Sequence, residues 1–203
     1  MSTTTTNRDA GQSSTTAAAR YGLMGLLLVQ LFIGYEWFVS GLTKMVRGGF
    51  PSGLADEMTE KSEGAAGWYT SFLDEIVIPN GTAFGYLIEI GELLVGVALV
   101  AAALLWLVGW ARLSQRGKTA VLLVTALAAL AGILMNVNFH LANGSAHPWL
   151  IPEEGFDEGV DLDSLMPAIQ AVLLFVSVAV LRAIRCEQRA SVSSGATALQ
   201  SPA

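Results

Sequence analysis

The chain has 203 residues, of which 53% are hydrophobic and only 14% charged, and its formal net charge is −6 at pH 7. A soluble domain carries about a quarter charged residues, so this composition excludes an ordinary soluble globular protein and indicates a membrane protein. The single Cys186 excludes an internal disulfide and a Cys-x-x-Cys redox pair.

Residues 1–19 form a Ser/Thr/Ala-rich leader that we predict to be disordered and cytoplasmic. Four apolar stretches follow, and at about 1.5 Å rise per residue each can cross a hydrocarbon core of about 30 Å. These stretches are Tyr21–Leu42, Phe84–Val108, Thr119–Leu141 and Ser164–Leu181. We therefore predict an all-α integral membrane protein with a four-transmembrane-helix bundle in residues 20–185, followed by a disordered cytoplasmic tail in residues 186–203.

The longest connection joins the first two apolar stretches. Its second half, "GWYTSFLDEIVIPN" (Gly67–Asn80), places Trp68, Phe72 and Ile76 at helical spacing. This spacing predicts a short amphipathic helix at the outer membrane interface that ends at Pro79. The remaining tryptophans lie near the ends of the spans, as in an aromatic belt; stacking of Trp37 or Trp149 on a ring-shaped ligand is the alternative.

Basic residues gather at one side of the predicted membrane. They precede the first stretch, fill the loop between the second and third, and follow the fourth: Arg8, Arg20, Arg112, Arg116, Lys118, Arg182, Arg185 and Arg189. The other two loops are mainly acidic, and the run Glu153–Asp163 is most simply a solvated surface. The positive-inside rule therefore predicts a multi-pass plasma-membrane protein with both termini cytoplasmic. A nucleic acid partner is excluded because no other basic surface exists.

Each apolar stretch carries polar residues along one face. In the first, Glu36, Ser40 and Lys44 recur every four residues, so they line one side of a helix. The corresponding residues of the other three stretches are Glu89 and Glu92, then Asn136 and His140, then Gln170. Glu36 and the polar residues of the other three stretches fall roughly 2–12 Å below the outer surface at about 1.5 Å per residue. Four helices with polar groups at one depth predict a single shared site.

Burying these groups is energetically costly. A charged side chain at mid-membrane costs at least about 2.5 kcal/mol, so such residues pair, hold a proton or face water. Polar groups that only hold helices together by hydrogen bonds are the simpler explanation for any single residue. For the whole group we favour a functional site, because ionisable residues inside membranes mark functional sites by default.

Three segments resemble a known family. "FVSGLTKM" (Phe38–Met45) resembles the first helix of the DoxX family. "FLDEIVIPNGTAFGYLIEIGELLVGVALV" (Phe72–Val100) and "LMNVNFHLANG" (Leu134–Gly144) resemble its DoxD branch, the membrane subunit of thiosulfate:quinone oxidoreductase. The resemblance implies a four-helix protein that passes electrons from a sulfur compound to quinone together with a DoxA-like soluble subunit. The chain itself carries no metal motif and no flavin-binding motif.

The leading hypothesis is a membrane subunit of a quinone-reactive oxidoreductase that oxidises thiosulfate to tetrathionate, with quinone as electron acceptor. The expected catalytic residues, which would supply protons or bind a quinone carbonyl, are Glu89, Glu92 and His140. The expected substrate-binding residues are Lys44, Arg47, Glu36, Asn136 and Gln170. Within this set, Lys44 and Arg47 would attract the anion, and Glu36 would orient Lys44.

Two other classes remain open. The chain could be a non-catalytic DoxX-type membrane anchor that recruits a soluble redox enzyme, with the polar cluster stabilising the bundle. It could also be a small transporter, although its apolar inner halves offer no visible exit path and no inverted repeat is detectable. A homo-oligomer is compatible with each class.

Overall fold

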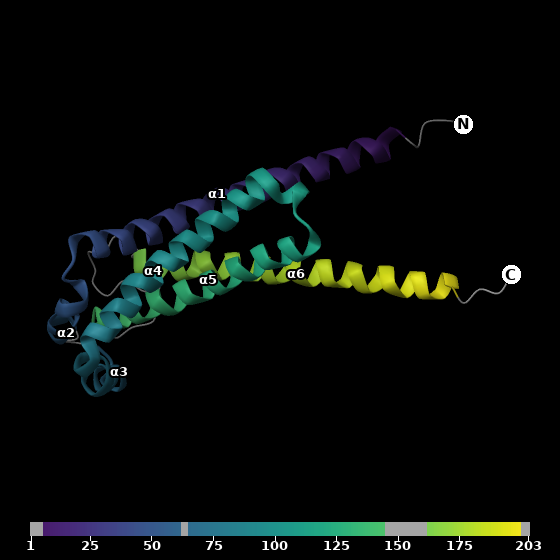
Figure 1. Ribbon diagram of the computed structural model, residues 1–203. Helices are drawn as coiled ribbons and strands as arrows, with labels where there is room; N and C mark the ends of the chain where they lie inside the picture. The colour runs from purple at the N-terminus through teal and green to yellow at the C-terminus, as the bar shows by residue number, and fades with distance from the viewer. Residues whose placement is uncertain (1–5, 62–64, 145–161, 200–203) are drawn as a thin grey trace.

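The protein is an all-α bundle of four long helices. A computed structural model describes residues 6–61, 65–144 and 162–199. The long helices are α1 (Thr6–Arg47), α4 (Gly81–Leu104), α5 (Gln115–Ala142) and α6 (Leu162–Leu199), and they run alongside one another (Figure 1). Within the described residues, four segments are long and apolar enough to cross a membrane: Tyr21–Arg47, Gly67–Arg112, Gln115–Ala142 and Leu165–Cys186. The predicted four-helix, multi-pass membrane architecture is confirmed.

Helical backbone continues beyond the predicted spans at both ends of the chain. α1 begins at Thr6 and α6 ends at Leu199, across segments for which composition predicted disorder. An established helix gains one backbone hydrogen bond for each residue added, and alanines such as those in 17–19 are the best helix formers. The division of the chain at residues 20 and 185 stays a prediction, and most of the acidic run, residues 153–161, together with Trp149, lies outside the described residues.

The segment between α1 and α4 contains more helix than expected. α2 (Phe50–Lys61) was not predicted, and its turn from α1 uses Gly48 and Gly49 at φ of 68° and 81°, where side chains other than glycine are strained. α3 (Gly67–Phe72) continues through a wide π turn (Leu73–Val77) and a short 3-10 turn (Ile78–Asn80) directly into α4. The helix does not end at Pro79. Proline is accepted there because it opens a helical turn, where no backbone N–H is required.

In the segment formed by α3 and the π turn, the face that packs on the bundle is displaced by one residue from the predicted apolar face. Tyr69, Leu73 and Val77 are buried, whereas Trp68 and Ile76 are exposed. An interfacial position for this exposed face is compatible with the fold and stays a prediction.

Glycines allow α1 and α4 to pack closely. A Cβ atom added at Gly41 of α1 would lie 2.5 Å from the backbone nitrogen of Leu93, and one at Gly96 of α4 would overlap the backbone of Phe38. Small residues at such positions let two membrane helices approach along their backbones. The core between all four helices is centred on fully buried side chains such as Leu99 and Leu173.

Candidate functional site

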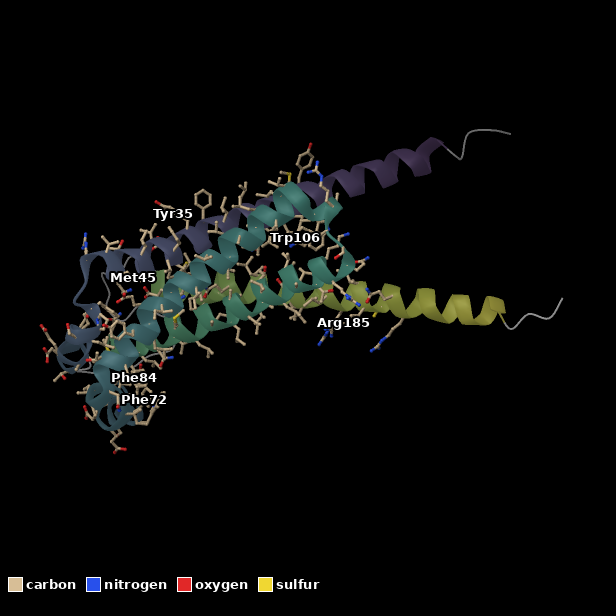
Figure 2. The ribbon with its side chains drawn as sticks, in the orientation of Figure 1. Tyr35, Met45, Phe72, Phe84, Trp106 and Arg185 are labelled. Atoms are coloured by element: carbon tan, nitrogen blue, oxygen red, sulfur yellow. The ribbon has the colours of Figure 1, made fainter. Side chains whose placement is uncertain are left out.

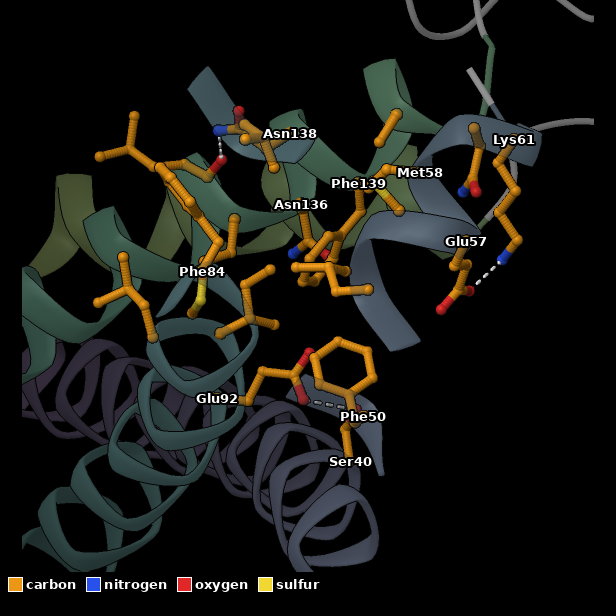
Figure 3. Close-up of a pocket in the computed structure, with 18 of the residues that line it drawn as sticks. Ser40, Phe50, Glu57, Met58, Lys61, Phe84, Glu92, Asn136, Asn138 and Phe139 are labelled. Atoms are coloured by element: carbon orange, nitrogen blue, oxygen red, sulfur yellow. Dashed lines mark hydrogen bonds and ion pairs between the residues drawn. The ribbon is translucent and has the colours of Figure 1, made fainter. Parts of the chain in front are cut away.

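A cavity of about 570 Å³ lies at the end of the bundle that carries α2 and α3 (Figure 3). Ligand pockets in proteins measure about 300–1,000 Å³. Much of its wall is aromatic, formed by Trp37, Phe50, Tyr69, Phe72, Phe84 and Phe139. The polar part of the wall comes from α1, α2, α4 and α5. This cavity brings together polar residues that lie far apart in the sequence.

The centre of the polar wall is an ion pair between Lys44 of α1 and Glu92 of α4. The ammonium nitrogen of Lys44 lies 2.6 Å from both carboxylate oxygens. Ser40 donates a hydrogen bond to Oε2 of Glu92 at 3.0 Å and accepts one from Lys44 at 3.0 Å. The dashed line between Ser40 and Glu92 in Figure 3 marks this bond. Because the Glu92 side chain is only 1% exposed, this pairing offsets the cost of burying its charge.

Aromatic rings complete the surroundings of the Lys44 ammonium. It lies 5.0 Å from the ring centroid of Phe50 and 5.9 Å from that of Phe139. Both distances are within the range of cation–π attraction. A carboxylate, a hydroxyl and two rings therefore already contact this cation.

The expected partnership of Glu36 with Lys44 is not formed. Glu36 lies eight residues before Lys44, about 12 Å along the helix axis, so its carboxylate is two turns away. Glu92 takes the position instead, because α4 crosses α1 there. Glu36 lines the cavity and is exposed, and it makes no ion pair or hydrogen bond with another described residue.

A second polar contact joins α5 to α6 behind the cavity wall. Asn136 lines the cavity and donates from Nδ2 to Oε1 of Gln170 at 3.3 Å. Gln170 is fully buried, and a Cβ atom at Gly132 would overlap its amide group. Glycine at position 132 therefore creates the space that Gln170 occupies. The Nε2 atom of Gln170 has no hydrogen-bond partner among the described residues.

Half of the predicted site residues line the cavity. Those that line it are Glu36, Lys44, Glu92 and Asn136, and those that do not are Arg47, Glu89, His140 and Gln170. Glu89 and His140 are buried elsewhere in the bundle, and Glu89 makes no hydrogen bond or ion pair with another described residue. Arg47 is the last residue of α1 and is exposed. Spacing along single helices could not reveal which side of each polar face the neighbouring helix would cover.

Trp37 also lines the cavity. The sequence favoured a place for it in an aromatic belt, with stacking on a ligand as the alternative. It is 4% exposed and its ring lies 6.4 Å from that of Phe139, so it belongs to the core rather than to a lipid-facing belt. Its indole nitrogen is buried without a hydrogen-bond partner among the described residues. The spacing of the sequence indicates that Trp37 lies on the same helix face as Ser40 and Lys44, because the three residues stand at i, i+3 and i+7.

The aromatic wall also contains one polar anchor. The hydroxyl of Tyr69 donates to the backbone oxygen of Asn138 at 3.0 Å, which ties α3 to α5 across the cavity. The described residues include no group of three or more His, Cys, Asp or Glu side chains that could hold a metal ion.

The fold and the cavity together define an all-α membrane protein of four spans with an aromatic-walled pocket at one end. Comparison of the chain with protein-family models, with curated proteins and with solved structures gives no match. Function must therefore be argued from the residues of the site.

Proposed function

We propose that the cavity binds a quinone and that the chain is the membrane subunit of a quinone-reactive oxidoreductase. The observation that carries this proposal is an aromatic-walled cavity with a Lys44–Glu92 pair in its wall, of which the Glu92 carboxylate is buried. A quinone ring is planar and uncharged, and it stacks on aromatic side chains. Reduction of the ring takes up two electrons and two protons. Lys44 is the wall residue that would deliver a proton to a quinone oxygen, and Glu92 would hold it in position.

The charges in the cavity favour a neutral ligand over an anion. Two cationic side chains of the described residues line the cavity, and both are paired: Lys44 with Glu92, and Lys61 with Glu57 at 2.8 Å. A dianion such as thiosulfate would therefore meet no unpaired cation among the described cavity residues, and it would meet the unpaired carboxylate of Glu36. A sulfur substrate would accordingly react outside the cavity.

The identity of the electron donor rests on the resemblance of three segments to the DoxX family and its DoxD branch. On that basis we propose thiosulfate as the donor, with a DoxA-like or other soluble subunit presenting it. Two thiosulfate ions would couple through a new S–S bond to form tetrathionate, and the two electrons released would reduce quinone to quinol. Under the positive-inside rule, the basic residues at the opposite end of the bundle support the proposal that both termini are cytoplasmic and that the cavity faces outward in the plasma membrane.

The direct test is thiosulfate-dependent quinone reduction by the full chain purified in nanodiscs together with its co-purifying proteins. We expect turnover with the parent protein and a decrease of about 100-fold in kcat for Glu92→Gln, because this change releases Lys44 from its position and a positioned proton-transfer group contributes about 10²–10⁴-fold. Glu75→Gln is the matched control, because Glu75 is exposed and does not line the cavity. If the parent preparation neither binds nor reduces quinone, the proposal is wrong.

A second prediction concerns the indole N–H of Trp37. Because this donor has no partner among the described residues, a quinone carbonyl that accepts its hydrogen bond would gain about 0.5–1.5 kcal/mol. Trp37→Phe keeps an aromatic ring in the wall, so we expect menadione affinity to fall about 3- to 10-fold and methylnaphthalene affinity to stay unchanged. Quenching of tryptophan fluorescence measures both affinities. Equal effects on the two ligands would assign Trp37 to packing alone.

A non-catalytic membrane anchor is the second candidate, because the pairing of both cavity cations also suits a purely structural network. An anchor would retain a soluble redox enzyme during purification and bind no quinone. Quantifying the quinone in the purified complex separates the two candidates.

A further inference from the structure

The end of the bundle opposite the cavity carries a basic cluster that the proposed function does not use. The cluster comprises Arg112, Arg116, Lys118, Arg182, Arg185 and Arg189. All five arginines are exposed, and Lys118 is half-buried. The chain as a whole has a net charge of −6, so this concentration of positive charge is a local feature.

The packing of α5 against α6 brings two parts of the cluster to one level. Gly132 of α5 contacts Gln170 of α6, and the two helices run in opposite directions (Figure 1). Arg116 lies 16 residues before Gly132 (132 − 116), and position 186 lies 16 residues after Gln170 (186 − 170). Arg116 therefore lies level with Arg185, and Figure 2 places Arg185 at the same end of the bundle as Trp106.

Among the side chains that the structure describes, no acidic group forms an ion pair with a member of this cluster. The ion pairs among the described residues are Lys44–Glu92 and Lys61–Glu57, and neither includes a member of the cluster. α5 also begins here, at Gln115, so the positive end of its helix dipole adds to the same region. Cations around a helix N-terminus repel one another and the dipole, and a bound anion removes that repulsion.

The cluster adjoins an apolar, tryptophan-bearing surface. Trp106 and Trp110 stack with ring centroids 3.4 Å apart, and the ammonium of Lys118 lies 5.4 Å from the Trp110 ring. On the same stretch of helix, Leu105 and Val108 are exposed. Tryptophans are enriched in the headgroup region of a bilayer, and exposed aliphatic side chains beside them are suited to contact acyl chains. The partner that fits has an anionic head and an apolar body.

We propose that this basic cluster is a binding site for an anionic phospholipid. Arg116 and Arg185 bind the phosphate from two helices, and the acyl chains lie along the exposed side of the segment 104–108. Guanidinium groups are suited to this role because they form paired hydrogen bonds with phosphate oxygens. The site ties α5 to α6 through the lipid, and it is independent of quinone chemistry at the other end.

The test titrates the purified full chain in a nonionic detergent with phosphatidylglycerol or with phosphatidylcholine of the same acyl chains, and follows bound lipid by native mass spectrometry. We expect a preference for phosphatidylglycerol that weakens as salt is raised. A basic residue near an anionic headgroup contributes about fivefold in affinity, from about 1 kcal/mol each. Arg116→Gln with Arg185→Gln should therefore reduce the preference about 10- to 25-fold.

Two controls make the result specific. Arg47→Gln removes one exposed arginine at the opposite end of the bundle and should leave the lipid preference unchanged. Inorganic phosphate should not raise the melting temperature as phosphatidylglycerol does, because it lacks the acyl chains. The proposal is overturned if the parent protein binds the two lipids equally, if the double variant keeps the preference, or if Arg47→Gln lowers it as much. If the double variant fails to fold, Arg116→Lys with Arg185→Lys replaces it and should lose only the hydrogen-bonded part of the preference, about threefold.

Discussion

Replacing Lys44 with Met is expected to lower the free energy of unfolding by about 3–5 kcal/mol, because it leaves the carboxylate of Glu92 buried without its counter-ion. At about 2–4 °C per kcal/mol for a chain of this size, the melting temperature should fall by about 10 °C. Adding Glu92→Gln to the same chain removes the uncompensated charge while Ser40 keeps an acceptor for its hydroxyl. The double variant should therefore recover most of the lost stability, as measured by tryptophan fluorescence during thermal unfolding.

The same pair of variants separates a structural role from a catalytic one. If Lys44 delivers a proton to quinone, the double variant will be stable but inactive in quinone reduction. If the ion pair only holds α1 against α4, the double variant will be both stable and active, which would contradict the catalytic role. Failure of the double variant to recover stability would instead show that the pair does not act as a coupled unit in the membrane.

Gly96→Ala is expected to destabilise the bundle by about 3 kcal/mol, although it adds only one methyl group. That methyl would overlap backbone atoms of Phe38, which cannot move aside as a flexible side chain does, so α1 and α4 must separate. The matched control is Gly91→Ala on the same helix, where the nearest atom is the sulfur of Met135 at 3.3 Å. Thermal unfolding of the two variants in the same detergent measures the difference.

A separation of α1 from α4 should also disturb the ion pair in the cavity wall. Ser40 and Lys44 lie on α1 and Glu92 on α4, so the ion pair depends on the approach that Gly41 and Gly96 allow. We expect Gly96→Ala to weaken quinone binding as well as stability. Equal unfolding temperatures for Gly96→Ala and Gly91→Ala would show that the helices tolerate the extra methyl and would contradict this account of the packing.

The sequence by itself determined the class of protein and the number of spans. Exposing runs of about 20 apolar residues to water is energetically unfavourable, so these runs separate this chain from soluble proteins. The sequence also indicated that Glu36, Ser40 and Lys44 share a helix face and that Glu92 lies at the same depth, because helical periodicity and rise are properties of a single helix. α2 was not predicted from the sequence because its 12 residues contain a proline, a glycine and few apolar positions.

Only the tertiary structure decided which polar residues meet. Lys44 pairs with Glu92 rather than with Glu36, Asn136 bonds to Gln170, and Trp37 turns into the core. Each outcome depends on the rotation of one helix about its axis relative to the next, and that rotation is set by close contacts such as Gly96 against Phe38. Contacts between helices arise from the shapes of two surfaces at once, and the periodicity of either sequence segment alone does not contain them.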